Sequence, residues 1–394
     1  MDTAIRIQDV IDHVKSNGWQ AMRDAVTDFI RFVMQRVLSL EQYEQLGCQP
    51  YERSEQRVDY ANGSYERTLS TTYGVISRLK IPRLRRGKFI TRLLQTYKRR
   101  TDELDHALLT WYLQGESCRD VTRSINAWTQ DILSAQSVSR LIQHVDQELL
   151  SWRQRPLPSD LVAVWLDGFS LKVRVKQKVR SCVILAALGR HPDGKWKILS
   201  FRLAQSESEH WWAGLLHQMY RRGMRTQLFI HDGAGGIAQA LRWIYPYTKT
   251  QRCLVHKIRN ILDAISNSKH AQEIRRDFWF VYHADSLPEA QERFRLFCRK
   301  WHPLEPKAVL VAKDDLTSTL AFFTLPEDLR ILCRSTNTLE WVYRELRRRV
   351  KVISSLPNPK SCERIVFLTL LYIEQILLNK SGNMTTFFSK FTHN

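Results

Sequence analysis

Apolar positions recur at helical spacing through about the first 150 residues. Residues 4–45 follow this period and predict one long helix. Three shorter helices are expected at about 101–114, at 118–127 and from 134 to about 149. Three short helices are typical of a helix-turn-helix, although the segment 128–133 is longer than the usual turn. A plain helical bundle is the competing interpretation.

The segment between the long helix and the shorter ones is polar and rich in turn residues. Its Asn62-Gly63 pair is a strong hairpin signal. Short strands are expected at 65–72 and 73–81. The sequence therefore predicts a small β element within a mainly helical region.

The pattern changes after Arg155-Pro156-Leu157-Pro158, which we interpret as a domain boundary. Three strands, a helix, a strand, a helix, a strand and a helix follow, an order that indicates an α/β fold with a mixed sheet. The strands are expected at 161–167, 181–189, 197–203, 226–232 and 248–254, and the helices at 207–222, 233–243 and 255–265. Residues 267–330 predict an inserted helical subdomain, and helices at 335–353 and 361–378 precede a loosely ordered tail.

Composition narrows the class of protein. The 394 residues are 43% hydrophobic, which supports packed cores, and 60 Lys and Arg against 40 Asp and Glu give a net charge of +20. Such an excess favours a polyanionic partner, with nucleic acid first. The longest apolar stretches, 182–188 and 365–373, are too short to span a membrane. Seven scattered cysteines and a charged N-terminus without a secretory signal predict a cytoplasmic protein.

One basic run is unusually uniform. Ten basic residues and no acidic residue occur between 78 and 100, including Lys80, Arg83, Arg85 and Arg86. A solvated charged face is one interpretation. Ten like charges repel one another, however, so contact with a phosphate backbone is the better explanation.

Two further sets of polar residues are candidates for DNA contact. Arg140 and Gln143 lie on the third short helix and would face the major groove if that helix reads DNA. Lys172 and Arg174 alternate with valines, which predicts a strand or hairpin with one basic face.

Two aspartates hold equivalent positions in the predicted α/β region. Asp167 and Asp232 each follow an apolar run and end a predicted strand. Ligands of open α/β sheets gather at strand ends, so the two carboxylates can meet over one site. Their repulsion requires a cation, and Mg²⁺ accepts such oxygen ligands. Either aspartate alone is also explained as a turn residue or a helix N-cap.

A third carboxylate is needed to hold two metal ions, and Glu340 is the candidate. Asn337 and Glu340 also resemble a capping box, so Glu340 has a purely structural alternative. Against this structural alternative, basic residues follow Glu340 on one face of the predicted helix, and another lies beside that face. Such residues are suited to hold a DNA backbone. These residues are Arg344, Arg347, Lys351 and the flanking Arg348.

Cys253 and His256 form the remaining cluster. One Cys-x2-His pair without a second pair is a poor zinc site. On a helix the two residues share a face and would brace the site beside Asp232. A packed cysteine with a hydrogen-bonded histidine explains the spacing equally well.

From about residue 40 to 360, the chain resembles the Mutator-type transposases of bacterial insertion sequences. The stretches that carry the resemblance occur in the family's order and cover most of the chain. Among them are YERSEQRVDYANGSYERTLSTTYG at 51–74, LKIPRLRRGKF at 79–89, VWLDGFSLKVR at 164–174, SESEHWW at 206–212, IHDGAGGI at 230–237, QRCLVHKIRNIL at 251–262 and STNTLEWVYRELRRRVKVISSLPN at 335–358.

The resemblance implies a ribonuclease H-like catalytic core with a helical insertion and a DDE triad. Asp167, Asp232 and Glu340 match the triad, Cys253 and His256 match the family's C/D-x2-H signature, and Arg347 matches a basic residue common after the glutamate. It also implies two Mg²⁺ or Mn²⁺ ions, double-stranded DNA as partner (terminal inverted repeats and target), assembly of several copies on that DNA, and a nucleoid-associated location. Gly-Ala-Gly-Gly after Asp232 departs from the bulkier stretch usual in the family.

The predicted organisation follows from these observations. Residues 1–100 form a helical and basic DNA-binding region, 101–156 a helix-turn-helix-like region, 157–266 the first part of the catalytic core, 267–330 the helical insertion, 331–380 the final catalytic helix with the C-terminal helix, and 381–394 the tail. Two alternatives remain open from the sequence. One is a DNA-binding protein that has lost catalysis, and the other is a nuclease that hydrolyses DNA without joining it.

Overall fold

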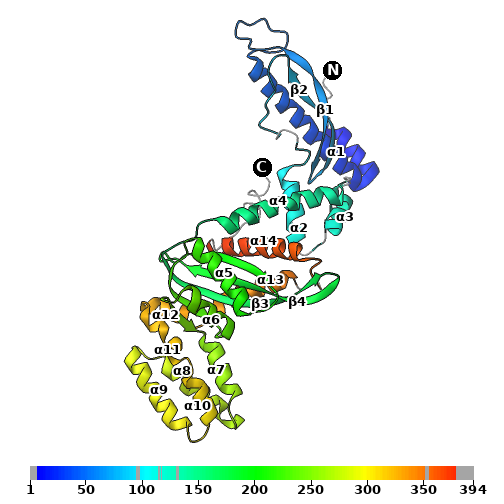
Figure 1. Ribbon diagram of the computed structural model, residues 1–394. Helices are drawn as coiled ribbons and strands as arrows, with labels where there is room; N and C mark the ends of the chain where they lie inside the picture. The colour runs from blue at the N-terminus through cyan, green and yellow to red at the C-terminus, as the bar shows by residue number, and fades with distance from the viewer. Residues whose placement is uncertain are drawn as a thin grey trace. The chain divides into compact units, whose positions relative to one another are not determined.

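The structure is a computed structural model that describes residues 7–94, 98–113, 116, 118–129, 133–350 and 355–378 (Figure 1). Lys351 and the predicted tail lie outside the described residues. The chain divides into two compact units, Met1–His144 and Val145–Gly382. The division falls inside a helix, before the proline-containing segment at 155–158.

The first unit combines a long helix with a two-stranded hairpin. Helix α1 (Ile7–Leu46) packs on strands β1 (Ala61–Thr71) and β2 (Gly74–Leu84). Leu38 of α1 joins Leu69 and Ile76 of the hairpin in a small core, against which Ile30 and Met34 pack. Three helices complete this part of the chain, namely α2 (Asp102–Leu113), α3 (Cys118–Thr129) and α4 (Ala135–Gln154). The predicted two strands and three shorter helices are confirmed, and the predicted long helix is present with a break at Gly18, whose φ of 64° and ψ of −148° are not helical.

The Asn62-Gly63 hairpin signal was wrong. The two strands reverse at Thr71↔Gly74, and Asn62-Gly63 lies inside β1, where the pairing register shifts between Ala61 and Ser64. Gly63 has a φ of 68°, the left-handed conformation that the same dipeptide adopts in a tight turn. A β-bulge and a tight turn both contain this left-handed conformation, so the local sequence does not distinguish a bulge from a turn.

The second unit is built on a five-stranded mixed sheet of order β5-β4-β3-β6-β7. Strands β3 and β4 pair antiparallel, as do β4 and β5, whereas β6 runs parallel to β3 and β7 parallel to β6. The strands are β3 (Leu161–Val175), β4 (Lys178–Arg190), β5 (Trp196–Ala204), β6 (Thr226–His231) and β7 (Lys249–Arg252). The predicted α/β architecture with a mixed sheet is therefore present.

Helices cover both faces of this sheet (Figure 1). Helices α5 (Glu209–Arg221) and α6 (Gly235–Ile244) bury one face, where Trp212 and Leu216 pack with Val164 of β3. Helices α13 (Asn337–Val350) and α14 (Pro359–Leu378) cover the other, where Tyr343 stacks on Phe169. Alternate residues of β3 thus pack into the cores on opposite faces of the sheet. This explains why the sequence of β3 is apolar without interruption up to Leu166.

Helices alone fill the fully described stretch between β7 and α13. After α7 (Leu254–Asp263) come η1 (Ser268–His270), α8 (Ala271–Tyr282), α9 (Leu287–Trp301), α10 (Pro306–Lys313), α11 (Leu316–Thr319), η2 (Ala321–Thr324) and α12 (Glu327–Cys333). The helical character predicted for 267–330 is confirmed. No helix in the described ranges is long and apolar enough to cross a membrane.

Candidate active site

Asp167 lies inside a strand, not at its end. Strand β3 continues to Val175, and Asp167 pairs with Ala186 of β4. The prediction that Asp167 ends its strand was therefore wrong. The parallel pairing with β6, however, does stop just before it, at Trp165↔Ile230. Asp167 thus lies just beyond the point where the pairing of β3 with β6 ends. Because Asp167 is inside a strand, the alternative that it is a turn residue is excluded.

Asp232 follows β6 directly, as predicted. It lies two residues after Ile230, just as Asp167 lies two residues after Trp165, so the two aspartates occupy corresponding positions just beyond the last β3–β6 pair. One carboxylate oxygen of Asp232 accepts a hydrogen bond from the Ala234 N–H at 2.9 Å. Asp232 therefore shapes its own turn, but the N-cap position of α6 belongs to Ala234.

The electrostatics of Asp167 show how near the two carboxylates are. The pKa of Asp167 is raised to about 7, chiefly by burial and in part by the negative charge of Asp232, against the hydrogen bond from the Gly168 N–H. His256 opposes this effect, while Glu207 adds to it. A buried carboxyl group with a raised pKa beside another carboxylate marks a candidate functional site.

Glu207 is a site residue that the sequence analysis did not assign. Burial raises its pKa, and the charge of Asp232 adds to this effect. A Cβ placed on Gly168 would lie 2.4 Å from a Glu207 carboxylate oxygen, and one on Gly236 would lie 2.6 Å from the Glu207 carbonyl. Glycines on β3 and α6 thus allow Glu207 to approach Asp167 and Asp232. The available signal was a glutamate just after the third strand, within SESEHWW.

Glu340 stands on α13, whose start is fixed by a buried threonine. The Thr336 hydroxyl lies 3.4 Å from a Glu340 carboxylate oxygen and 3.5 Å from the Cys253 sulfur. The capping box predicted from Asn337 was wrong, because Asn337 is already the first helical residue. The Glu340 carboxylate therefore faces a side-chain hydroxyl at the helix start.

Helix α13 also contacts the Asp167 strand. The Tyr343 hydroxyl donates a hydrogen bond to the Asp167 carbonyl, and the Tyr343 ring stacks on Phe169 at 5.4 Å. Glu340 lies three residues earlier, on the same face of the helix. The structure thus brings the element that carries Glu340 against the strand that carries Asp167.

Cys253 and His256 lie next to the carboxylates. Burial raises the pKa of the Cys253 thiol, but hydrogen bonds from His256 and Thr336 outweigh burial and lower it. The hydrogen bond with Cys253 raises the pKa of His256 against burial, with smaller contributions from Asp232 and Asp167. Cys253 is buried and hydrogen-bonded with His256, as the packed-pair interpretation expects, and the bracing of the site by this pair stays a prediction. Among the described residues, no three His, Cys, Asp or Glu side chains form a group suited to hold a metal ion.

The basic residues of α13 reach the surface beside the site. Arg344, Arg347 and Arg348 are exposed. The Arg347 guanidinium lies 5.2 Å from the centre of the Phe169 ring, and Arg348 pairs with Glu345 at 3.1 Å. Lys172 and Arg174 are exposed on β3 between the buried Leu171 and Val173, as the alternation predicted.

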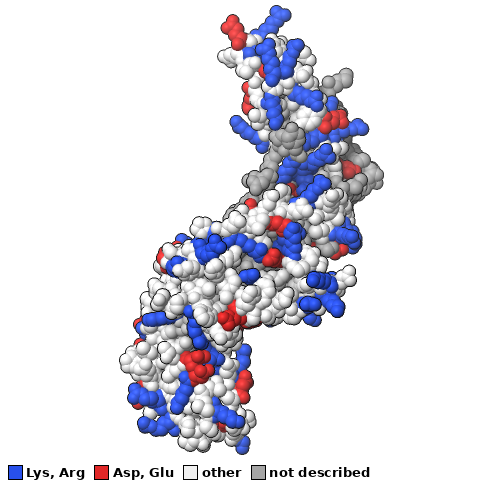
Figure 2. Space-filling view, viewed as in Figure 1, with Lys and Arg blue, Asp and Glu red and all other residues white. Residues whose placement is uncertain are grey.

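The basic run of the first unit is only partly compensated. Lys80, Arg83, Arg85 and Arg86 are exposed on and after β2, and Lys and Arg side chains are prominent over the hairpin in Figure 2. At the end of the run, Arg100 pairs with Asp105 at 2.7 Å, and Lys98 lies 3.5 Å from the same carboxylate. The exposed basic residues of the run that these ion pairs do not include therefore lie on and after β2.

The candidate reading residues of the third short helix are also at the surface. Arg140 and Gln143 are exposed on α4, whereas Val138, Leu141 and Ile142 are buried. The predicted division between polar and apolar positions of this helix is thus confirmed. Its role in DNA reading stays a prediction.

Comparison with known proteins identifies the class. Residues 4–375 match the family described as "Transposase, Mutator family", and the chain belongs to this family. The transposase of insertion sequence element ISRM5 from Rhizobium meliloti is 34% identical over 87% of this chain and 86% of its own length. The transposase of insertion sequence element IS406 from Burkholderia multivorans is 31% identical over 89% and 91%. Membership makes the protein a transposase, a class of enzymes that cleave DNA and transfer its strands.

Among solved structures, the chain resembles the Drosophila P element transposase strand transfer complex. The TM-score is 0.39 at 9% sequence identity, over 74% of this chain and 94% of that chain.

Proposed function

We propose that this transposase binds the ends of its insertion sequence and cleaves and joins DNA at a site formed by Asp167, Asp232 and Glu340. The observation that carries the proposal is the meeting of Asp167 and Asp232 at the point where the parallel strands β3 and β6 part. Three antiparallel strands followed by two parallel strands are consistent with a ribonuclease H-like core. Helix α13, held against Asp167 by Tyr343, supports Glu340 as the third carboxylate.

The donor chemistry of these residues suits a hard divalent cation. Asp167 and Asp232 provide carboxylate oxygens, and a cation would offset both the burial and the repulsion by Asp232 that raise the Asp167 pKa. Asp167, Asp232 and Glu340 would hold two Mg²⁺ or Mn²⁺ ions. When bound, such ions activate an attacking water or DNA 3′-hydroxyl and stabilise the leaving oxygen.

The other residues act on the DNA itself. Arg344, Arg347 and Arg348 on α13, with Lys172 and Arg174 on β3, hold the phosphate backbone near the carboxylates. The basic hairpin contributes non-specific affinity, and Arg140 and Gln143 of α4 select bases at the terminal inverted repeats. Copies of the chain assemble on the paired ends and target DNA, in the cytoplasm at the nucleoid.

The test is an end-cleavage and joining assay on labelled DNA. Asp167→Asn, Asp232→Asn and Glu340→Gln each keep the side-chain size but lose the charge that attracts Mg²⁺. Each should reduce cleavage and joining on the order of a thousandfold while sparing DNA binding. Glu345→Gln, on the same helix and paired with Arg348, is the matched control and should stay active.

Three outcomes would count against parts of the proposal. A folded Glu340→Gln protein that cuts at the wild-type rate would remove Glu340 from the site and leave its structural role. A wild-type protein that releases hydrolysed ends without joined products would be a nuclease. A wild-type protein that binds ends without cutting them in Mg²⁺ would be a silent DNA-binding protein.

A further inference from the structure

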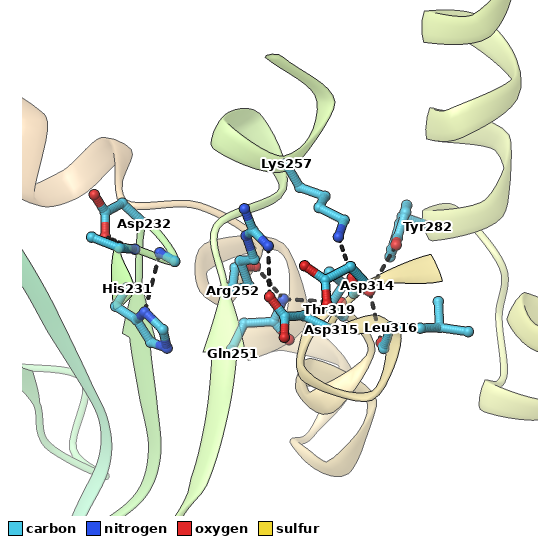
Figure 3. A network of polar contacts seen from close by, with 12 residues as sticks. His231, Asp232, Gln251, Arg252, Lys257, Tyr282, Asp314, Asp315, Leu316 and Thr319 are labelled. Carbon is cyan, nitrogen blue, oxygen red and sulfur yellow. Dashed lines mark hydrogen bonds and ion pairs between the residues drawn. The ribbon is translucent and has the colours of Figure 1, made fainter. Parts of the chain in front are cut away.

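Three polar side chains next to the site are buried against the helical segment. Gln251 and Arg252 end β7, and Lys257 lies on α7. Their exposed fractions are 0%, 8% and 0%. All three contact residues 314–322, the stretch around α11 (Figure 3). Charged and amide groups are rarely this buried unless a fixed partner satisfies them.

Gln251 and Lys257 attach this stretch firmly to the sheet. The Gln251 amide donates to the Thr319 carbonyl at 2.9 Å and accepts from the Phe322 N–H at 2.8 Å. The Lys257 ammonium donates to the Asp314 carbonyl. A shift of residues 314–322 would leave these buried groups without partners, which is unfavourable. The segment is therefore part of the scaffold of the site.

Arg252 extends from this scaffold towards the Asp232 loop. One of its terminal nitrogens donates to the Asp315 carboxylate at 2.6 Å. Its Nε is buried and has no hydrogen-bond partner among the described residues. A Cβ on Gly233 would lie 2.3 Å from this Nε and 2.9 Å from the guanidinium carbon. The guanidinium thus lies directly against the backbone of Gly233.

Gly233 is the residue through which this contact reaches the carboxylate. It joins Asp232 to Ala234, whose N–H holds the Asp232 carboxylate at 2.9 Å. Its φ of 95° is a conformation that other residues rarely adopt, and its own N–H donates to His231 at 3.1 Å. The backbone on both sides of Asp232 is therefore fixed, and a displaced Gly233 would turn the carboxylate.

We infer that Arg252, held by Asp315, is a positioning residue that fixes Gly233 and with it the direction of the Asp232 carboxylate. This inference rests on the proposed function of Asp232. It gives residues 314–322 a role in the reaction, because they hold the guanidinium in place. Asp315 itself adopts a φ of 57°, a left-handed conformation uncommon for residues other than glycine, in making this contact.

Arg252→Lys separates this role from simple stabilisation. Lysine keeps the positive charge that pairs with Asp315 but lacks the planar guanidinium that covers Gly233. We expect a folded protein with wild-type affinity for end DNA and a cleavage rate, at saturating DNA and Mg²⁺, reduced about ten- to a hundredfold. Mn²⁺ affinity, measured by electron paramagnetic resonance, should fall severalfold.

Two further variants keep the test decisive if Arg252→Lys does not fold. Gly233→Ala displaces the guanidinium and should show the same losses, whereas a Cβ on Gly235 would meet nothing within 4 Å, so Gly235→Ala is its matched control. Asp315→Asn releases the guanidinium from its anchor and should also slow cleavage. Glu292→Gln, which breaks an exposed 3.0 Å pair with Arg295 in the same helical segment, should not.

The outcomes separate this inference from the proposed function. If Arg252→Lys, Gly233→Ala and Asp315→Asn all cleaved DNA at the wild-type rate and bound Mn²⁺ with wild-type affinity, the positioning role alone would be overturned. Lower melting temperatures with unchanged rates for the folded protein would assign Arg252 to stability only, and would overturn it too. A wild-type protein that neither cleaves ends nor binds Mn²⁺ would overturn the proposed function, and the inference with it.

Discussion

At the scale of single residues, burial and the neighbouring charge of Asp232 make two carboxyl groups of the site, Asp167 and Glu207, difficult to ionise. Asp167 is the clearest case, because burial and, in part, the charge of Asp232 raise its pKa to about 7. A group of this kind destabilises the metal-free protein at neutral pH. Function, not stability, is the physical reason to keep such a carboxyl group in a sheet.

We therefore expect Asp167→Asn to stabilise the protein in EDTA at pH 8. The folded-state pKa of about 7 lies above the ordinary value of 3.8, so the folded protein loses stability as the pH rises between these values. Removal of the carboxyl group should raise the free energy of unfolding at pH 8 by about 2–4 kcal/mol. Near pH 4 the gain should vanish. Melting curves at both pH values measure this, and an equal effect at both would contradict a raised pKa.

Glu207 is expected to contribute to catalysis as well. Its raised pKa and its approach to Gly168 place it with Asp167 and Asp232. Glu207→Gln should reduce cleavage at least tenfold, because it removes a charge at the reacting centre. Glu209→Gln, two residues along the chain at the start of α5, is the control. Equal cleavage rates in the two variants would show that Glu207 only packs against the site.

At the scale of elements, the position of α13 depends on contacts far apart in the sequence. The Thr336 N–H and hydroxyl both reach the Cys253 sulfur, and the Leu254 N–H donates to the Arg334 carbonyl at 2.8 Å. The start of α13 is thus tied to the start of α7. This junction fixes where Glu340 stands.

Loss of the Thr336 hydroxyl should loosen this junction. Thr336→Val removes the buried hydroxyl that contacts both Cys253 and Glu340. The variant should lose about 1–2 kcal/mol of unfolding free energy and cleave transposon ends more slowly. Thr336→Ser should restore both properties. Thr324→Val, which removes an exposed hydroxyl bound to the Ala321 carbonyl, is the control. Denaturant unfolding and cleavage assays check the prediction, and a Val variant that matches wild type in both would refute it.

At the scale of the whole molecule, a net charge of +20 predicts DNA affinity that depends strongly on salt. If about six phosphates are neutralised, the slope of log K against log salt should be near −5. Replacement of Lys80, Arg83, Arg85 and Arg86 by alanine should make this slope shallower by about 3, because these exposed side chains lie on and after β2.

A control with the same loss of charge shows whether the effect is local. Four exposed basic residues of the helical segment are suited to it, namely Arg275, Arg299, Lys307 and Lys313. Their replacement by alanine should change the slope less than the β2 variant does. Equal changes would mean that net charge, and not the hairpin, determines affinity. A wild-type slope shallower than about −2 would contradict a broad phosphate-binding face.

The sequence by itself determined the elements and the pair of aspartates. Apolar runs such as 161–166 and 228–230 identified buried strands, because a strand covered on both faces has no polar alternation. Helical spacing of apolar residues identified α1, α5 and α14, because burial along a packed helix recurs with the helical period. Asp167 and Asp232 were visible because a charge after an apolar run is an exception that local structure does not require.

Only the tertiary structure decided which residues surround that pair. Asn62-Gly63 has the same backbone preference in a bulge as in a turn, so only strand pairing distinguished the two. Thr336 and Arg252 carried no local signal, and Glu207 only its place just after the third strand, because their partners Cys253, Asp315 and Gly168 lie on other elements. Periodicity reports whether a residue is buried, whereas contact between distant segments depends on how the sheet and helices pack in three dimensions.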